Sequence, residues 1–438
     1  MTALRVHNEG AFVYNQLTLK SPKRGPGCLS YPPDAYKNTF SDHCSFKRKA
    51  VLRMYKNLTD SIIYVGVDDT DIDFFEGQYI VPNGISYNSY IIMDEKIAVM
   101  DTVDARKTQE WLSNVKEALN GKSPDYLVIS HMEPDHSANI FTLMEEYPEM
   151  KVVGSVQIFK FAGQFYGEIP AEKKVVIKEG SQLELGSHVL NFISAPMVHW
   201  PEVMFSYEQK EKVLFSADGF GKFGALCNDE EWDCEARRYY INIVGKHGAM
   251  VQNVLKKAAG LDISMICPLH GPVLAENLGY YINKYDIWSS YEPEDKGVCI
   301  VYASAHGNTK KAALTLAGKL EEKGLTVETF DLARDDIAEA VENAFRYDRL
   351  VLASITYDMG IFPAMANFLY RIESKGLKKR TVGIIENGSW APKSGGIIKD
   401  TLGRLEDITL LEPVVTLKSA LNDASMAQLD ALADALAK

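Results

Sequence analysis

The chain has 438 residues, which is too long for one ordinary domain and predicts two or three. Hydrophobic residues make up 46% of it and charged residues 24%, a composition typical of soluble globular proteins. The longest apolar runs are shorter than the roughly 20 residues of a membrane span, so we expect no membrane segment. The net charge of −12 argues against a general nucleic-acid binder.

Residues 1–53 differ from the rest of the chain. They hold nine Lys/Arg against three Asp/Glu, have weak periodicity and contain several Pro and Gly residues. We predict an extension that is disordered or not part of the fold. A translation start at Met54, where the pattern becomes regular, and an organelle presequence are the alternatives.

The six cysteines include no C-x-x-C pair. In a chain of this length, that pattern indicates neither a disulfide framework nor a zinc ribbon. It predicts a reducing, cytoplasmic location, and it places no rubredoxin-type iron site within this sequence.

Residues 54–292 alternate between short apolar runs and turn signals. A helical pattern is expected at 108–119, and two more at 235–244 and 250–259. The expected strands are 62–66, 85–93, 96–101, 126–130, 151–154, 175–178, 189–193, 203–207, 213–216 and 263–266. This succession predicts a two-layered β core flanked by helices, an αββα sandwich.

A polar stretch at 289–297 is the predicted domain boundary. Beyond it, strands and helices alternate strictly, and a helix at 423–437 closes the chain. The five expected strands are 298–302, 326–330, 349–353, 381–385 and 409–415. Five β-then-α units with short connections predict a doubly wound parallel sheet of flavodoxin type over residues 297–438.

A cluster of possible metal ligands follows the strand expected at 126–130. The pattern is H-x-E-x-D-H, formed by His131, Glu133, Asp135 and His136. Three further candidates each come just after an expected strand, and they are His199, Asp218 and His270. Loops at one edge of a sandwich can bring such residues to a common point. Seven ligands are too many for one tetrahedral zinc and predict two metal ions, with Asp218 as the bridge because a carboxylate has two oxygens.

The ligand types indicate which metal is preferred. Most hydrolases built on such a sandwich carry His where this chain has Glu133. An additional carboxylate makes the site harder and more anionic, which favours iron or manganese over zinc.

Three loops of the C-terminal domain end at the carboxyl edge of its sheet, where doubly wound folds bind ligands. The first is a βα turn of small and hydroxyl residues at a helix N-terminus, which suits the phosphate of FMN better than a dinucleotide. Trp390 and Tyr357 are positioned to lie against a flat ring. The candidate residues are Ser304, Ala305, His306, Gly307, Asn308, Thr309, Thr356, Tyr357, Asp358, Gly360, Asn387, Gly388, Ser389 and Trp390.

The H-x-E-x-D-H stretch, together with V-H-W-P at 198–201, S-A-D-G-F-G at 216–221 and C-P-L-H-G-P at 267–272, resembles the flavodiiron proteins. These proteins join a metallo-β-lactamase-like αββα domain to a flavodoxin-like domain, and the resemblance covers about 57–438. It implies one iron on His131, Glu133 and His199, a second on Asp135, His136 and His270, and Asp218 between them.

The same resemblance implies an activity. The expected reaction is the reduction of dioxygen to water, of nitric oxide to nitrous oxide, or both. FMN would pass electrons to the iron pair from an external donor such as rubredoxin or a reduced deazaflavin. Family members are head-to-tail homodimers, so we expect a homodimer or a dimer of dimers.

Two other classes of function stay open from the sequence. One is a binuclear metallo-β-lactamase-like hydrolase with an accessory flavodoxin domain, against which Glu133 argues. The other is a flavodoxin-like electron carrier whose first domain is a relic, against which the complete set of seven ligand-type residues argues.

Overall fold

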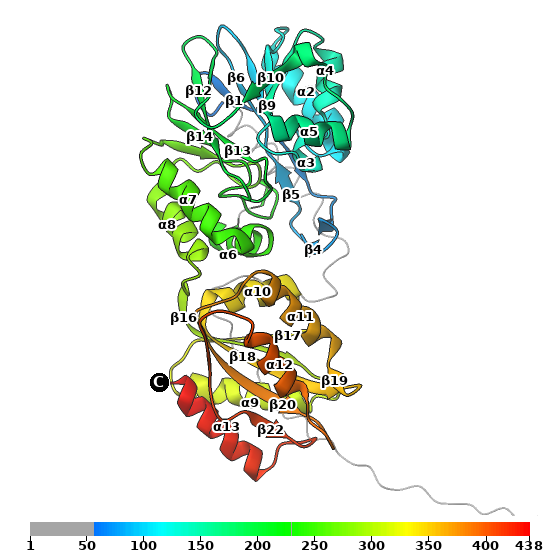
Figure 1. The fold of residues 1–438 in the computed structure, drawn as a ribbon, viewed down its shortest axis with the longest axis vertical. Helices are drawn as coiled ribbons and strands as arrows, with labels where there is room; N and C mark the ends of the chain where they lie inside the picture. Colours follow the sequence, from blue (N-terminus) through cyan, green and yellow to red (C-terminus); the bar gives the residue numbers. More distant parts are fainter. Residues whose placement is uncertain (1–56, 229) are drawn as a thin grey trace, which may run out of the picture.

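The computed structural model describes residues 57–228 and 230–438 and shows two bodies stacked along the long axis of the molecule (Figure 1). The prediction for residues 1–53 lies outside this range. Among the described residues, every helix is too short or too polar to cross a membrane.

The N-terminal body is built from two stacked sheets. The first has six strands in the order β1 (Ile62–Tyr64), β6 (Tyr90–Ile92), β7 (Ala98–Met100), β8 (Tyr126–Val128), β9 (Lys151–Ser155) and β10 (Lys174–Ile177). The second has five strands in the order β11 (Gln182–Glu184), β12 (Val189–Ser194), β13 (Met204–Glu208), β14 (Val213–Phe215) and β15 (Met265–Cys267). Both sheets contribute to one buried cluster, which is the layer between them.

Helices cover the outer faces of both sheets. Because strand side chains alternate, Tyr90 and Ile92 face the layer between the sheets, while Ile91 faces the helices. The first sheet is covered by α2 (Thr108–Leu119), α4 (Ile140–Glu146) and α5 (Val156–Phe165), and the second by α6 (Trp232–Tyr239), α7 (Gly248–Ala258) and α8 (Leu278–Ser289). The predicted αββα sandwich is therefore confirmed.

Two predictions of single elements are wrong in this body. The strand expected at 85–93 is two strands, β5 (Ile85–Tyr87), which pairs with β2 (Val67–Asp69), and β6. They separate at Asn88, whose amide donates to the carbonyl oxygens of Pro268 and Gly271 (both 2.8 Å). The helix expected at 235–244 begins three residues earlier as α6 and continues as a π-helix over Tyr240–Val244.

The sequence analysis also missed several elements. These are the helices α5 and α8, the strands β2, β11, β3 (Phe74–Phe75) and β4 (Tyr79–Ile80), and four short helices: α3 (Pro134–Ser137), η1 (Ala105–Lys107), η2 (Ala171–Lys173) and η4 (Gly245–His247). Cys227 and Cys234 are disulfide-bonded, although the cysteine spacing predicts no disulfide framework. A disulfide requires two Cα atoms to lie close together in the fold, and the spacing of cysteines along the chain does not determine that distance.

The C-terminal body is a doubly wound parallel sheet. Its strand order is β17 (Val327–Asp331), β16 (Asp295–Ala303), β18 (Tyr347–Tyr357) and β20 (Arg380–Asn387), with β21 (Ile408–Leu410) and β22 (Val415–Leu417) sharing the fifth position. The strand expected at 409–415 is therefore two strands, which lie on either side of Pro413, a residue that has no N–H to donate to a ladder. A short strand, β19 (Gly360–Ile361), pairs antiparallel with the end of β18.

Helices pack on both faces of this sheet. On one face, α9 (Asn308–Glu322) and α13 (Asp423–Leu436) bury leucines and alanines against it. On the other lie α10 (Ile337–Arg346), α11 (Pro363–Ser374) and α12 (Ser394–Leu402). Figure 1 shows α10 and α11 between this sheet and the N-terminal body, and α10 contacts α6 there.

Buried ion pairs join the two bodies. Arg237 on α6 binds Glu294 through two hydrogen bonds (Nε–Oε2 2.6 Å, Nη2–Oε1 3.0 Å) and also reaches Glu342 on α10 (3.3 Å). Its neighbour Arg238 pairs with Asp336 at the start of α10 (2.9 Å). These contacts hold α6, the helix that follows the Asp218 loop, against the domain that carries the second predicted site.

Candidate dinuclear metal centre and flavin pocket

Strand ends of both sheets deliver the predicted metal ligands to one place. His131 and Glu133 follow β8, and α3 carries Asp135 and His136. The remaining three follow β12, β14 and β15 and are His199, Asp218 and His270. The loop after β8 is fixed on both sides, because Ser130 N–H donates to Asp101 (2.6 Å) and its carbonyl accepts from Met204 N–H (3.0 Å).

The first group of ligand atoms consists of His131, Glu133, His199 and one oxygen of Asp218, all within 4.8 Å of one another. His131 Nε2 lies 3.3 Å from Glu133 Oε2 and 3.3 Å from His199 Nε2. His199 Nε2 lies 3.0 Å from Asp218 Oδ2. Four ligand atoms therefore surround one point.

The second group consists of Asp135, His136 and His270, again within 4.8 Å. Asp135 Oδ2 lies 3.4 Å from His136 Nε2 and 3.3 Å from His270 Nε2. The other oxygen of Asp218, Oδ1, lies 3.3 Å from His136 Nε2 and 3.8 Å from His270 Nε2. Each carboxylate oxygen of Asp218 thus faces a different group, the arrangement of a bridging ligand.

Several of these atoms are buried without a hydrogen-bond partner among the described residues. They are both carboxylate oxygens of Asp135 and of Asp218, and Nε2 of His136 and of His270. A buried polar atom without a partner is costly, so such atoms cluster where something else binds them. Two cations fit this set of four imidazoles and three carboxylates, and the carboxylates are hard ligands that shift its preference toward iron or manganese.

A second layer of contacts orients two of the imidazoles. Glu202 Oε1 accepts from His131 Nδ1 (2.8 Å) and from Met132 N–H (2.9 Å). His270 Nδ1 donates to the carbonyl oxygen of Ser86 (2.7 Å). Both contacts leave Nε2 unprotonated and directed at the centre, as a metal requires. The sequence analysis did not select Glu202 or Ser86, because no spacing rule relates them to the histidines.

The pKa shifts of the site residues show that the buried carboxylates favour positive charge at this position. Burial lowers the pKa of His199, but Asp218 and Glu133 outweigh it and raise that pKa to about 9. Burial also opposes protonation of His131, yet Asp218, Glu133 and Glu202 raise its pKa well above the usual value. Conversely, burial opposes ionisation of Asp218, while His131 and His136 hold its pKa well below the usual range. A metal cation supplies the same positive charge in place of these protons.

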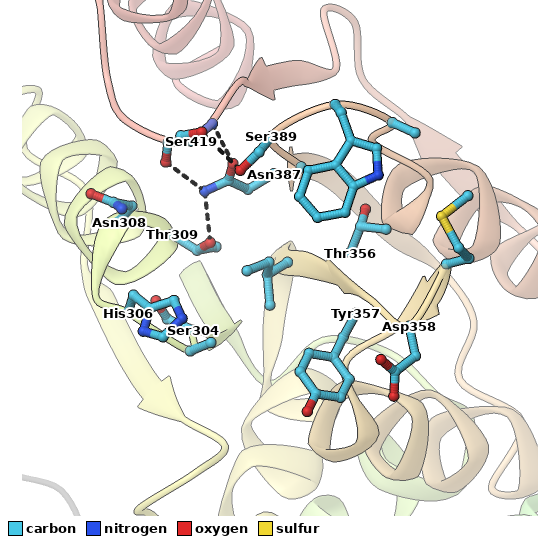
Figure 2. Close-up of a pocket in the computed structure, with 16 residues that line it drawn as sticks. Ser304, His306, Asn308, Thr309, Thr356, Tyr357, Asp358, Asn387, Ser389 and Ser419 are labelled. Carbon is cyan, nitrogen blue, oxygen red and sulfur yellow. Dashed lines mark hydrogen bonds between the residues drawn. The ribbon is translucent and has the colours of Figure 1, made fainter.

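The second predicted site is a cavity of about 510 Å³ at the carboxyl edge of the C-terminal sheet (Figure 2). Most of the predicted flavin residues line it, and they are Ser304, Ala305, His306, Asn308, Thr309, Thr356, Tyr357, Asp358, Asn387, Gly388, Ser389 and Trp390. Gly307 and Gly360 are not among the lining residues. Four others line it that the sequence analysis did not select: Ile355, Met359, Ala391 and Ser419.

The first loop has the geometry of a phosphate-binding turn. Gly307 has φ +84°, a left-handed conformation that glycine adopts readily because it has no Cβ. Helix α9 begins at the next residue. Ser304 Oγ accepts from Gly307 N–H (3.1 Å), which holds the turn closed. The free N–H groups of the first helical turn can then bind an anion.

The ring side of the cavity is open. Trp390 is 87% exposed and therefore not a core residue of its own domain, while Tyr357 is 46% exposed and keeps an edge-to-face contact with Phe362. Figure 2 shows Tyr357 and Asp358 on the side opposite Asn308 and Ser419. An aromatic ligand bound at this edge would cover part of these side chains.

Fold and site together define a class of protein: a lactamase-like sandwich with two adjacent groups of possible metal ligands, followed by a flavodoxin-like domain. Family models agree, since residues 85–271 match the ODP family beta lactamase and residues 300–404 match flavodoxin.

Known proteins place the chain more narrowly. It is 30% identical to an anaerobic nitric oxide reductase flavorubredoxin of Vibrio vulnificus, over 83% of this chain and 75% of the relative. Among solved structures, it is similar to rubredoxin oxygen:oxidoreductase of Desulfovibrio gigas (28% identity, TM-score 0.80, 87% of this chain and 97% of that one). It shares its fold with the flavodiiron protein of Giardia intestinalis (24% identity, TM-score 0.80, 87% and 95% covered). The chain belongs to the flavodiiron protein family.

Proposed function

We propose that this protein reduces dioxygen to water, nitric oxide to nitrous oxide, or both, at a non-haem diiron centre. The observation that carries this proposal is the placement of Asp218 between two complete ligand groups, one of which contains Glu133. The names of similar proteins support both substrates, since the relative from Vibrio vulnificus is called a nitric oxide reductase and the D. gigas structure an oxygen oxidoreductase.

The ligand groups divide the iron sites. His131, Glu133 and His199 would hold one ion, Asp135, His136 and His270 would hold the other, and Asp218 would contact both. Glu202 and Ser86 keep the imidazoles of His131 and His270 in the tautomer that presents Nε2. Burial of six of the seven ligands excludes bulk water from the centre.

The flavin pocket would hold FMN. The turn at 304–309 would bind its phosphate, and Tyr357 and Trp390 would lie beside its ring. When bound, the iron pair would supply electrons to a diatomic gas, and FMN would supply further electrons taken from a donor. The chain's own contribution is to hold both cofactors at fixed positions.

Three further features are part of the proposal. The electron donor is external, such as rubredoxin or a reduced deazaflavin. The assembly is a head-to-tail homodimer or a dimer of dimers, located in the cytoplasm. The diiron domain spans 54–292 and the FMN domain 297–438.

The test begins with iron and FMN counts per chain, followed by anaerobic stopped-flow of the reduced protein against each gas separately. We expect two irons and one FMN, and oxidation by at least one gas. Asp218→Ala should abolish gas reduction while FMN stays bound, whereas Asp262→Ala, which removes an exposed aspartate, should change neither.

Three outcomes would contradict parts of this proposal. Two zinc ions with esterase or lactamase activity would favour a hydrolase. Unchanged turnover in Asp218→Ala would refute the assigned centre. A monomer that sediments as such and still turns over at full rate would refute the dimer.

A further inference from the structure

One side chain connects three of the loops that border the flavin pocket. Asn387 ends β20 and is 2% exposed. Its Nδ2 donates to Thr309 Oγ1 (3.3 Å) and to the carbonyl oxygen of Ser419 (3.0 Å), and its Oδ1 accepts from Ser419 N–H (3.1 Å). Figure 2 shows Asn387 between these two residues. Both amide hydrogens and the amide oxygen are therefore used within the protein, so this side chain orients other groups.

The contact with Thr309 sets the direction of a hydroxyl. Thr309 lies in the first turn of α9, is 1% exposed and lines the cavity. Because its oxygen accepts from Asn387, its O–H hydrogen stays available as a donor. At a helix N-terminus this donor adds to the backbone N–H groups that bind a phosphate.

The contact with Ser419 fixes a fourth loop, between β22 and α13. Ser419 has φ +77°, a conformation that residues other than glycine rarely adopt and that the surrounding contacts must hold. Asn387 holds its backbone from both sides, and Ser419 Oγ also lies 2.8 Å from Ser389 Oγ in the third loop. Ser419 lines the same cavity, so this network sets the position of two of its walls.

We propose that Asn387 is a positioning residue that makes the pocket selective for the phosphorylated flavin. It holds Thr309 as a donor toward the flavin phosphate and locks the Ser419 loop in place. This inference rests on the proposed function, because it requires that the pocket binds FMN. Its consequence is specific: Asn387 should contribute to the affinity for FMN far more than to the affinity for riboflavin, which has the same ring and no phosphate.

The test uses full-length protein from which flavin has been removed. Titration with FMN and with riboflavin, followed by quenching of flavin fluorescence, gives a Kd for each and their ratio. Asn387→Asp preserves size but removes both donors, and its carboxylate would take the Thr309 hydrogen for itself. We expect the preference for FMN over riboflavin to fall by about tenfold or more, as loss of a hydrogen bond to a charged group predicts. Thr309→Val removes the same donor directly and should lower the ratio similarly.

The matched control is Asn422→Ala. Asn422 is also an asparagine, but it lies in the β22–α13 connection, where its side chain caps α13 by accepting from Ser425 N–H (3.0 Å). It does not line the cavity. Its loss should lower the denaturant midpoint of the protein and leave the FMN-to-riboflavin ratio unchanged. Equal weakening of both flavins in Asn387→Asp, or an unchanged ratio in both Asn387→Asp and Thr309→Val, would overturn the inference. If the wild-type protein binds no FMN, the proposed function fails as well.

Discussion

Glu202 lies outside the set of metal ligands, yet the structure predicts that its charge controls iron affinity. It is 2% exposed and accepts from His131 Nδ1 at 2.8 Å and from Met132 N–H at 2.9 Å through one oxygen. Glu202→Gln keeps the size of the side chain and an accepting oxygen, so both hydrogen bonds can form. The negative charge is lost, and an NH2 group takes the place of the second, unpartnered carboxylate oxygen.

The size of the effect follows from these contacts. A hydrogen bond to a charged group contributes about 1.5–3 kcal/mol, against about 1 kcal/mol for a neutral one. The difference of about 0.5–2 kcal/mol corresponds to a loss of roughly 2- to 30-fold in affinity. Loss of a carboxylate behind a ligating histidine typically costs about 10- to 100-fold, which overlaps this range. We therefore expect Glu202→Gln to bind Fe²⁺ about 10- to 30-fold more weakly.

Anaerobic competition between the protein and a chelator of known affinity measures this loss. Glu208→Gln is the matched control, because Glu208 is also fully buried and also pairs with a histidine, His188 (3.1 Å), in the hairpin region distant from the metal ligands. The control should lose stability but keep its iron affinity. An affinity of Glu202→Gln within twofold of wild type, or an equal loss in the control, would refute the reasoning.

Three further predictions concern stability. Arg237→Met removes the arginine that pairs with the buried carboxylate of Glu294 and should cost about 3–5 kcal/mol of unfolding free energy. Arg404→Met breaks a bidentate pair at the surface and should cost far less, because solvent screens that pair. Denaturant titration measures both. Burial, opposed by Arg237, raises the pKa of Glu342 to about 7, above its unfolded value of 4.5. Protonated Glu342 therefore contributes fully to the free energy of unfolding below about pH 4.5, and this contribution, up to about 3 kcal/mol, should be lost as the pH rises through 7. Glu342→Gln should not show this loss. Chelation of iron should lower the thermal midpoint of wild-type protein by an amount that grows with the logarithm of free metal, and Asp218→Ala should show little such dependence.

Local patterns were sufficient for the strands that precede the metal ligands and for the four adjacent ligand residues at 131–136. Short continuous apolar runs predict β7 and β8, because both strands are buried on both faces and need apolar side chains at successive positions. The H-x-E-x-D-H stretch places four possible ligand residues within six positions, so their proximity needs no knowledge of the fold. The small-residue turn before α9 likewise predicts an anion site from local geometry.

Other features depended on contacts between distant segments. The break at Asn88 exists because its amide binds the loop that carries His270, about 180 residues away, and no local propensity encodes that contact. The same holds for Ser419, whose positive φ is maintained by Asn387.

The sequence by itself determined the two-domain architecture, the chemical types of the ligands and the strands that carry them, since these follow from periodicity and side-chain chemistry. Only the tertiary structure decided that Glu202 and Ser86 orient two of the imidazoles and that Asn387 joins three pocket loops. Hydrogen bonds form over about 3 Å and depend on angle, so which atoms meet is set by the packing of whole sheets and cannot be read from spacing along the chain.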